Sequence, residues 1–197
     1  MNMSNYEKII SENLSKLFSR KSDSEIYIKA FGEECIIRPD GILINGIREI
    51  SPIGIIISVY SLYADDKELI LEPFISLKDM PESRLYHGAF HENVEIPLVS
   101  YVQAIYDKRY LLINRMGIKG KEYKFKDTGD FSLVLFPLPK IALRYIFYFE
   151  DDEFPASVTC LYSNNASSFL PVDVLADLAE YTSKKIIDII RSEQYHE

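Results

Sequence analysis

The apolar residues of the first twenty positions recur with the period of a helix. Ser4 and Glu7 have the spacing of a capping box, in which each side chain accepts a hydrogen bond from the other residue's backbone N–H. Apolar side chains then follow three or four positions apart, at Tyr6, Ile9, Ile10, Leu14, Leu17 and Phe18. The pattern predicts that the chain opens with an amphipathic helix.

From residue 25 the pattern becomes that of strands. Ile26 and Ile28 alternate with polar residues, Gly32 interrupts the run, and an extended apolar run then resumes. The segment GILINGIREI places Asn45 and Gly46 between apolar flanks, and both residues tolerate the positive φ of a type I′ turn. We expect a small meander with a tight hairpin at this dipeptide.

The middle of the chain is predicted to be mostly helical. Ser51 and Pro52 supply an N-cap and a first-turn proline to IGIIISVYSLYAD, which is apolar on nearly every side. The segment after Asp66 contains several prolines and is expected to be irregular. Pro97 is expected to start the next helix, which DKRYLLINRMG extends or follows up to Gly117.

The last third carries the most apolar strands. FSLVLFPLP and IALRYIFYF do not alternate, which predicts cover on both faces, as in the centre of a sheet, with Pro137 and Pro139 separating the two strands. SVTCLYS is a predicted third strand, and a final helix follows Pro171. Because no βαβ alternation occurs, the predicted class is α+β, a mostly antiparallel sheet with helices packed against it, in a single domain over residues 1–197.

Composition and charge exclude several classes of partner. The formal net charge is -8 and the 22 Lys and Arg residues are scattered, whereas a nucleic-acid binder needs a basic surface. The same negative charge disfavours an anionic lipid surface, and no apolar run approaches the roughly 20 residues that span a bilayer. The N-terminus is amphipathic and contains acids, unlike an export signal. We expect a cytoplasmic protein that contacts neither nucleic acid nor membrane.

The sequence gives no motif for a bound cofactor. Cys35 and Cys160 lie far apart and neither has a CxxC partner, so an iron–sulfur cluster or a zinc knuckle within the chain is disfavoured. In a reducing cytosol both are expected to be buried thiols. GIKGK lacks the serine or threonine of a P-loop, and neither a GxGxxG nor a GxSxG motif is present. We therefore expect no cofactor.

Several ordered blocks carry a family resemblance. The most specific is LPK, followed after one strand by DEFPA, and ISPIGIIISVYSLYAD and a block containing Tyr86 and Phe90 precede it. In this order the blocks resemble the uncharacterised prokaryotic family known as domain of unknown function 3786, over residues 41–191. The chain departs from the family pattern at Tyr148, where tryptophan is usual. The resemblance implies a compact prokaryotic domain and carries no established activity.

The stretch FEDDEFP contains four consecutive acids, Glu150 to Glu153. Two like charges about 4 Å apart repel by about 1 kcal/mol in water and about 4 kcal/mol at a protein surface, so these acids need solvent or a cation. Successive side chains of such a turn point in different directions, unlike the ligands of a calcium loop. The favoured interpretation is a solvated turn whose Phe154 and Pro155 dock onto the core.

His87 and His91 stand four positions apart, which would place both rings on one helical face. With Glu92 or Glu95 they could form a two-histidine, one-carboxylate site for zinc or manganese. Such a metal would lower the pKa of a bound water, as in a metal-assisted hydrolase. Gly88 and nearby prolines weaken a helix here, so surface or helix-end histidines are the favoured interpretation, and the hydrolase is the alternative.

The leading functional hypothesis is a non-catalytic domain that binds a small ligand or a partner protein between the helical middle and the C-terminal strands. The 14 tyrosines and 11 phenylalanines include a middle cluster that could line such a pocket, although filling a core is the favoured role. An exposed aromatic patch would instead favour a homodimer. Loops are where rigid scaffolds carry recognition groups. The first candidates are therefore Tyr86, Phe90, Asp130, Asp151, Asp152 and Glu153.

Overall fold

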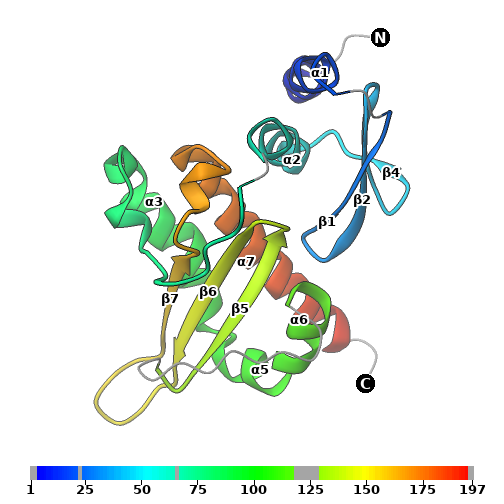
Figure 1. Ribbon diagram of the computed structural model, residues 1–197. Coiled ribbons are helices and arrows are strands. Elements are labelled where there is room, and N and C mark those ends of the chain that lie inside the picture. Colours follow the sequence, from blue (N-terminus) through cyan, green and yellow to red (C-terminus); the bar gives the residue numbers. More distant parts are fainter. Residues whose placement is uncertain (1–3, 22–23, 65–66, 118–128, 195–197) are drawn as a thin grey trace.

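The computed structural model of the chain describes residues 4–21, 24–64, 67–117 and 129–194. Its strands form two antiparallel sheets, one with the order β1-β2-β3-β4 and one with the order β5-β6-β7 (Figure 1). The chain is α+β as predicted, with its strands divided between two sheets. The strands are β1 (Ile26–Ala30), β2 (Glu33–Arg38), β3 (Gly41–Ile44), β4 (Ile47–Arg48), β5 (Phe131–Leu138), β6 (Ile141–Tyr148) and β7 (Ser157–Tyr162).

Helices precede, separate and follow the two sheets. The α-helices are α1 (Asn5–Phe18), α2 (Pro52–Tyr63), α3 (His87–Phe90), α4 (Ile96–Val99), α5 (Val102–Asp107), α6 (Arg109–Met116) and α7 (Val172–Gln194). Short 3₁₀ turns occur at η1 (Leu77–Asp79), η2 (Ser83–Tyr86) and η4 (Ala166–Ser168), and η3 (His91–Glu95) is a π-helix.

The two N-terminal helices form where local signals predicted them. In α1, Glu7 N–H donates to Ser4 Oγ (3.2 Å) and Ser4 N–H donates to Glu7 Oε2 (2.8 Å), which confirms the capping box. In α2, Ile53 N–H donates to Ser51 Oγ (3.2 Å) and Pro52 occupies the first turn. The two helices pack against each other, so the apolar side chains of both are covered (Figure 1).

The predicted hairpin at Asn45 and Gly46 joins β3 to β4. Asn45 has φ 49° and Gly46 has φ 78°, the left-handed backbone that this two-residue turn requires. The turn places the Asn45 side chain beside β2, where it contributes to the site described below.

The helical middle begins earlier than predicted. Pro97 lies in the first turn of α4, as predicted, but α4 continues a helical run that begins before it with η2, α3 and η3. Ile96 N–H donates to the carbonyl of His91, five residues back, which is a π-helical bond. The wider turn gives room for a proline ring that would otherwise meet the carbonyl four residues before it. A proline that starts a helix and one accommodated by a π turn look alike in sequence.

In the second sheet β6 is central, and all its residues except Tyr148 are buried. The central position predicted for β6 is confirmed. The same prediction is wrong for β5, which lies at an edge of the sheet. Pro137 lies within β5, where the register shifts between Leu135 and Leu138, so it does not separate the strands. Proline is tolerated there because edge strands and bulges do not need every ladder donor.

Helices cover one face of this sheet. Tyr145 of β6 lies with its hydroxyl 3.2 Å from Ser183 Oγ of α7, and α7 runs behind the sheet in Figure 1. No described helix crosses the face turned toward the viewer. On that face Arg144 lies 5.7 Å from the ring centroid of Phe74, which belongs to the extended segment before η1. Since Ile141 to Phe147 are all buried, the predicted cover of β6 on both faces is confirmed, and among the described elements α7 supplies it on one face and the segment of Phe74 contributes to it on the other.

One apolar core joins the two sheets. The buried cluster includes Ile37 and Ile42 from the first sheet, Leu143 and Phe147 from the second, and Leu178 from α7. Within the described parts of the chain, no helix combines the length and apolar character needed to cross a bilayer.

Candidate functional site

The acidic segment between β6 and β7 is an exposed turn closed by one of its own carboxylates. Asp151 Oδ1 accepts hydrogen bonds from the backbone N–H groups of Glu153 (2.9 Å) and Phe154 (2.7 Å). Asp152 and Glu153 are solvent-exposed. Phe154 is 66% exposed and Pro155 is also exposed, so the prediction that these two dock onto the core is wrong. Backbone hydrogen bonds, and not apolar burial, hold this turn.

Asp130 also bonds the backbone. Its Oδ2 accepts a hydrogen bond from Phe149 N–H (2.7 Å), and its own N–H donates to the carbonyl of Phe147 (3.0 Å). Gly129, just before it, has φ 65°, and a Cβ there would lie 2.5 Å from the Phe147 carbonyl oxygen. These contacts extend the hydrogen bonding between β5 and β6 beyond the end of the two strands. Asp130 therefore has a structural role.

Tyr86 and Phe90 lie apart from these acids. Phe90 is buried, with its ring centroid 6.0 Å from that of Tyr162, so it belongs to the core. Tyr86 is half-buried and borders an open groove of about 590 Å³ between η2 and the start of α7. Figure 1 shows α3 and the β6–β7 loop at opposite ends of β7, so the structure does not bring the predicted candidates into one site.

The structure does bring His87, His91 and Glu95 to one small pocket of about 130 Å³. His87 Nε2 lies 2.9 Å from Ser83 Oγ, and His91 Nδ1 lies 2.7 Å from Glu95 Oε2. The other oxygen, Glu95 Oε1, accepts a hydrogen bond from Cys160 N–H (2.9 Å). Glu95 therefore ties the π-helix to β7. Among the residues that the structure describes, no group of three or more His, Cys, Asp or Glu is placed to hold a metal ion.

Both cysteines are buried thiols, as predicted. Burial raises the pKa of Cys35 to about 12, and the charge of Glu49 adds to the effect. Burial, with the charge of Glu95, raises the pKa of Cys160 well above its ordinary value. Because the thiolate is the reactive form, both thiols are unreactive as nucleophiles at neutral pH.

Another hollow, smaller than the groove beside Tyr86 but larger than the histidine pocket, lies where the first sheet and α2 meet α7, and we call it the α7 cleft. Its volume is about 390 Å³, which is within the range of small-molecule sites. Its floor is apolar, because it is formed by Ile44, Ile53 and two buried residues. Ile44 and Ile53 are only half-buried, so part of each side chain is open to the cleft. The lining residues are Ala30, Phe31, Glu33, Ile44, Glu49, Ile53, Tyr181, Lys184, Lys185 and Asp188.

The β1–β2 turn fixes one wall of the α7 cleft. Phe31 has φ 50° and Gly32 has φ 83°, so the chain reverses within two residues before Glu33. Phe31 N–H donates to the carbonyl of Pro137 in β5 (2.7 Å), and a Cβ on Gly32 would lie 3.1 Å from the carbonyl of Arg115 in α6. The turn is therefore packed against two other elements, which holds Glu33 toward α7.

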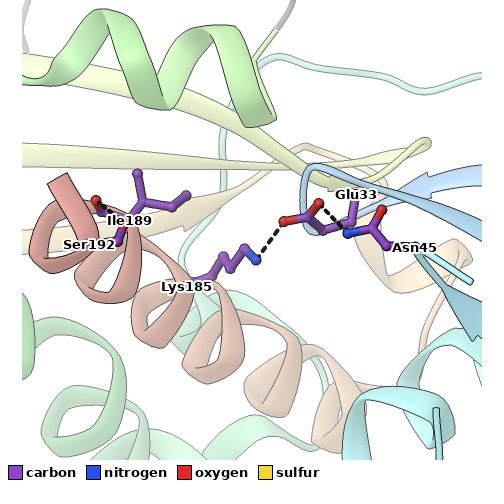
Figure 2. Close-up of polar contacts among 5 residues, drawn as sticks. All are labelled: Glu33, Asn45, Lys185, Ile189 and Ser192. Carbon is purple, nitrogen blue, oxygen red and sulfur yellow. Dashed lines mark hydrogen bonds and ion pairs between the residues drawn. The ribbon is translucent and has the colours of Figure 1, made fainter. Parts of the chain in front are cut away.

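Glu33 joins the first sheet to α7, as Figure 2 shows. Its Oε1 lies 2.7 Å from Lys185 Nζ, and its Oε2 accepts a hydrogen bond from Asn45 Nδ2 (2.7 Å). Two hydrogen bonds lower the pKa of Glu33, and the one from Asn45 has a larger effect than the one from Lys185. The carboxylate is therefore ionised at neutral pH. One turn farther along α7, Ser192 Oγ donates to the carbonyl of Ile189 (3.0 Å).

Lys184, the neighbouring lysine, is paired within α7. Its Nζ lies 2.6 Å from Glu180 Oε1 and 4.9 Å from the ring centroid of Tyr181. The hydrogen bond to Glu180 raises the pKa of Lys184. Both lysines of the α7 cleft thus carry their charge in ion pairs.

The remaining acids of the α7 cleft are less engaged. Glu49 is half-buried and its Oε1 accepts a hydrogen bond from Ser51 N–H (2.6 Å). Asp188 is exposed and has no hydrogen-bond or ion-pair partner among the described residues. The α7 cleft therefore presents two carboxylates with accepting capacity beside its apolar floor.

The α7 cleft was not predicted from the sequence, although one signal for it is present there. Tyr181, Lys184, Lys185 and Asp188 recur at the i, i+3, i+4, i+7 spacing, which places them along one face of the final helix. A stripe of this kind is usually a solvated face. Only the packing of the β1–β2 turn beside it makes the stripe one wall of a concave site.

The family comparison covers nearly all of this architecture. A family model described as Domain of unknown function (DUF3786) matches residues 9–185. The match begins well before the predicted start of the resemblance at residue 41, and it includes every lining residue of the α7 cleft except Asp188. No curated protein and no solved structure matches the chain. On the extent of this match, the chain belongs to the DUF3786 family, the one that its ordered blocks predicted.

Proposed function

We propose that this protein is a non-catalytic domain that binds a small molecule in the α7 cleft. The observation that carries the proposal is the combination of a half-buried apolar floor with a rim of charged groups, where three separate elements converge. Small-molecule sites bury the ligand against apolar surface and orient it with a few polar groups. The α7 cleft replaces the location between the helical middle and the C-terminal strands that the sequence suggested.

The state of the lysines favours binding over catalysis. An amine acts as a nucleophile or base only when it is deprotonated. Lys185 lies 2.7 Å from Glu33 and Lys184 lies 2.6 Å from Glu180, and the hydrogen bond to Glu180 raises the pKa of Lys184. These ammonium groups hold the rim of the α7 cleft together through their ion pairs.

Filling the α7 cleft tests the proposal. We expect Ile53→Trp to weaken the binding of small amphiphilic compounds by about tenfold or more, because the indole would occupy the ligand's volume. The measurement is an isoleucine-methyl NMR titration against a panel of such compounds, with thermal unfolding to check the fold. Ile47→Trp is the matched control, since Ile47 is 75% exposed and does not line the α7 cleft. A panel that shifts no methyl signal of Ile44 or Ile53 in the unmodified protein would overturn the proposal.

We propose a cytoplasmic location and no direct partnership with nucleic acid or membrane, supported by the net charge of -8. A homodimer is a further proposal for the exposed aromatic side chains near the β6–β7 loop. Tyr148 is 44% exposed and Phe154 66% exposed, and such side chains are often buried in an interface. Sedimentation velocity over a range of protein concentrations tests it, and a concentration-independent monomer would contradict it.

The rival proposal is a metal-assisted hydrolase at the histidine pocket, supported by the presence of His87, His91 and Glu95 in one lining. Against it, both oxygens of Glu95 are already engaged, by His91 and by the backbone of Cys160. Elemental analysis of the purified protein separates the two proposals. Stoichiometric zinc or manganese that is lost when both histidines become alanine would favour the hydrolase.

A further inference from the structure

The charged groups that line the α7 cleft are unequally satisfied. The two lysines each have a carboxylate partner within hydrogen-bonding distance, Lys185 with Glu33 and Lys184 with Glu180. A ligand carboxylate or phosphate would have to compete with these partners. The rim is therefore poorly prepared to receive an anion.

The acids leave accepting capacity. Asp188 has no partner among the described residues, and Glu49 has one hydrogen bond, from the backbone N–H of Ser51. Both carboxylates line the α7 cleft beside Ile44 and Ile53. A ligand with N–H donors and a positive charge would find acceptors that the protein itself does not use.

The net charge of the lining points the same way. Three acids, Glu33, Glu49 and Asp188, face two lysines. Two further charged residues lie outside the lining. Glu180, which is negative, pairs with Lys184, and the positive charge of Arg115 acts on Glu33. The lining has one more negative than positive charge, and this surplus is unchanged when these two residues are counted. The protein as a whole is also negative, with a net charge of -8. Such a field raises the local concentration of cations.

Resting on the binding function proposed above, we propose that the ligand of the α7 cleft is an organic amine, with a protonated nitrogen between Asp188 and Glu49 and an aliphatic chain on Ile44 and Ile53. A primary ammonium has three donors, which suits Asp188, without a partner among the described residues, and Glu49, which accepts one hydrogen bond from the backbone. Its hydrocarbon chain covers the apolar floor, as the stem of a lysine covers apolar surface while its charged end stays at the rim.

Three probes with the same six-carbon chain test the class of ligand. Hexylamine, hexanol and hexanoate differ in their end group, so the floor contributes similarly to the binding of each. We expect hexylamine to shift the Ile44 and Ile53 methyl signals at a concentration about tenfold lower than either of the other two. The titrations are run at pH 7 and low salt, and repeated at high salt, where the advantage of hexylamine should shrink.

Isosteric variants assign the effect to the two carboxylates. Asp188→Asn and Glu49→Gln each remove a charge, and we expect each to weaken hexylamine binding about fivefold and to leave hexanol binding unchanged. Asp188 is exposed, and a glutamine at position 49 keeps an acceptor for Ser51 N–H, so both variants should fold. Asp152→Asn, in the exposed β6–β7 loop, is the control and should bind hexylamine as the unmodified protein does.

The outcomes separate this inference from the proposed function. If hexanol or hexanoate shifts the two methyl signals as readily as hexylamine, the α7 cleft binds ligands but the amine class is wrong. If none of the three probes shifts them, the binding function and the amine class both fail. If hexylamine binds best but Asp188→Asn and Glu49→Gln do not weaken it, the assigned carboxylates are wrong and the inference is overturned.

Discussion

Asp130 and Asp151 show how an aspartate chosen from sequence as a recognition group can serve the backbone instead. Each accepts hydrogen bonds from N–H groups within or beside its own loop, at distances of 2.7 to 2.9 Å. A charged acceptor on a backbone donor makes a comparatively strong hydrogen bond and fixes a loop end. The sequence does not distinguish an aspartate that accepts backbone hydrogen bonds from one that is free to bind a ligand, because the path of the folded chain decides which groups lie next to it.

Gly129 allows the first prediction to be made at a single residue. Its φ of 65° disfavours any side chain, and a Cβ would in addition lie 2.5 Å from the carbonyl oxygen of Phe147. That oxygen belongs to a central strand and cannot move easily. We expect Gly129→Ala to lower the free energy of unfolding by about 3 kcal/mol or more, measured by urea denaturation.

Gly46 provides a matched control for this prediction. It also has a positive φ, 78°, but a Cβ there would meet nothing within 4 Å. Gly46→Ala should therefore cost only the conformational penalty, about 1 kcal/mol. Equal losses in the two variants would show that the steric contact at Gly129 is not what matters.

Among the elements, β7 is an edge strand whose outer side is closed by neighbours. Tyr162 and Ile75 exchange two backbone hydrogen bonds of 2.9 Å, and Cys160 N–H is taken by Glu95 from η3. Open edges expose backbone groups that can pair with other chains, so such cover limits aggregation. The π-helix thus has a structural consequence, because it presents Glu95 to the edge of the sheet.

The second prediction concerns this edge. Glu95→Ala would leave Cys160 N–H without its acceptor, and we expect a loss of about 1–3 kcal/mol in the free energy of unfolding. Amide exchange at Cys160 should become faster than in the unmodified protein. Glu92→Ala removes an exposed glutamate of the same π-helix and should change neither quantity appreciably. Unchanged exchange at Cys160 in Glu95→Ala would contradict the assigned role.

Elements with strong local signals were predictable and those with competing signals were not. The capping box at Ser4 and the type I′ turn at Asn45 each specify a backbone geometry within a few residues. The start of the helical middle and the edge position of β5 depend on neighbours far away in the chain. Pro97 marked the first turn of α4 correctly, but the π turn that extends the helical run before it is not encoded by any short motif.

For the whole molecule, α7 is the element that ties the two sheets together. It packs behind the second sheet through Tyr145, and it is ion-paired to the first sheet through Lys185 and Glu33. The apolar core includes residues of both sheets, so neither can expose its inner face without disturbing the same cluster. We expect the described parts of the chain to unfold as one cooperative unit.

The third prediction tests this cooperativity by native-state amide exchange. Ile37 of β2 and Phe147 of β6 are both fully buried and lie in different sheets. We expect the free energies of opening that their amide exchange reports to agree within about 1 kcal/mol and to depend equally on urea concentration. A lower free energy and a weaker urea dependence for Ile37 alone would show that the first sheet opens separately, and the single domain predicted from the sequence would then be wrong.

The sequence by itself determined the α+β class, the capped N-terminal helices, the hairpin, the central apolar strand and the family. These follow from periodicity, turn chemistry and ordered blocks, all of which act over short distances along the chain. The tertiary structure alone decided that the strands form two sheets, that Phe90 belongs to the core and that Asp151 closes its own turn. It also decided that the stripe from Tyr181 to Asp188 lines a cleft, because that depends on the β1–β2 turn, more than a hundred residues earlier, packing beside α7. Local pattern fixes which face of an element is apolar or charged, whereas long-range packing decides what that face meets.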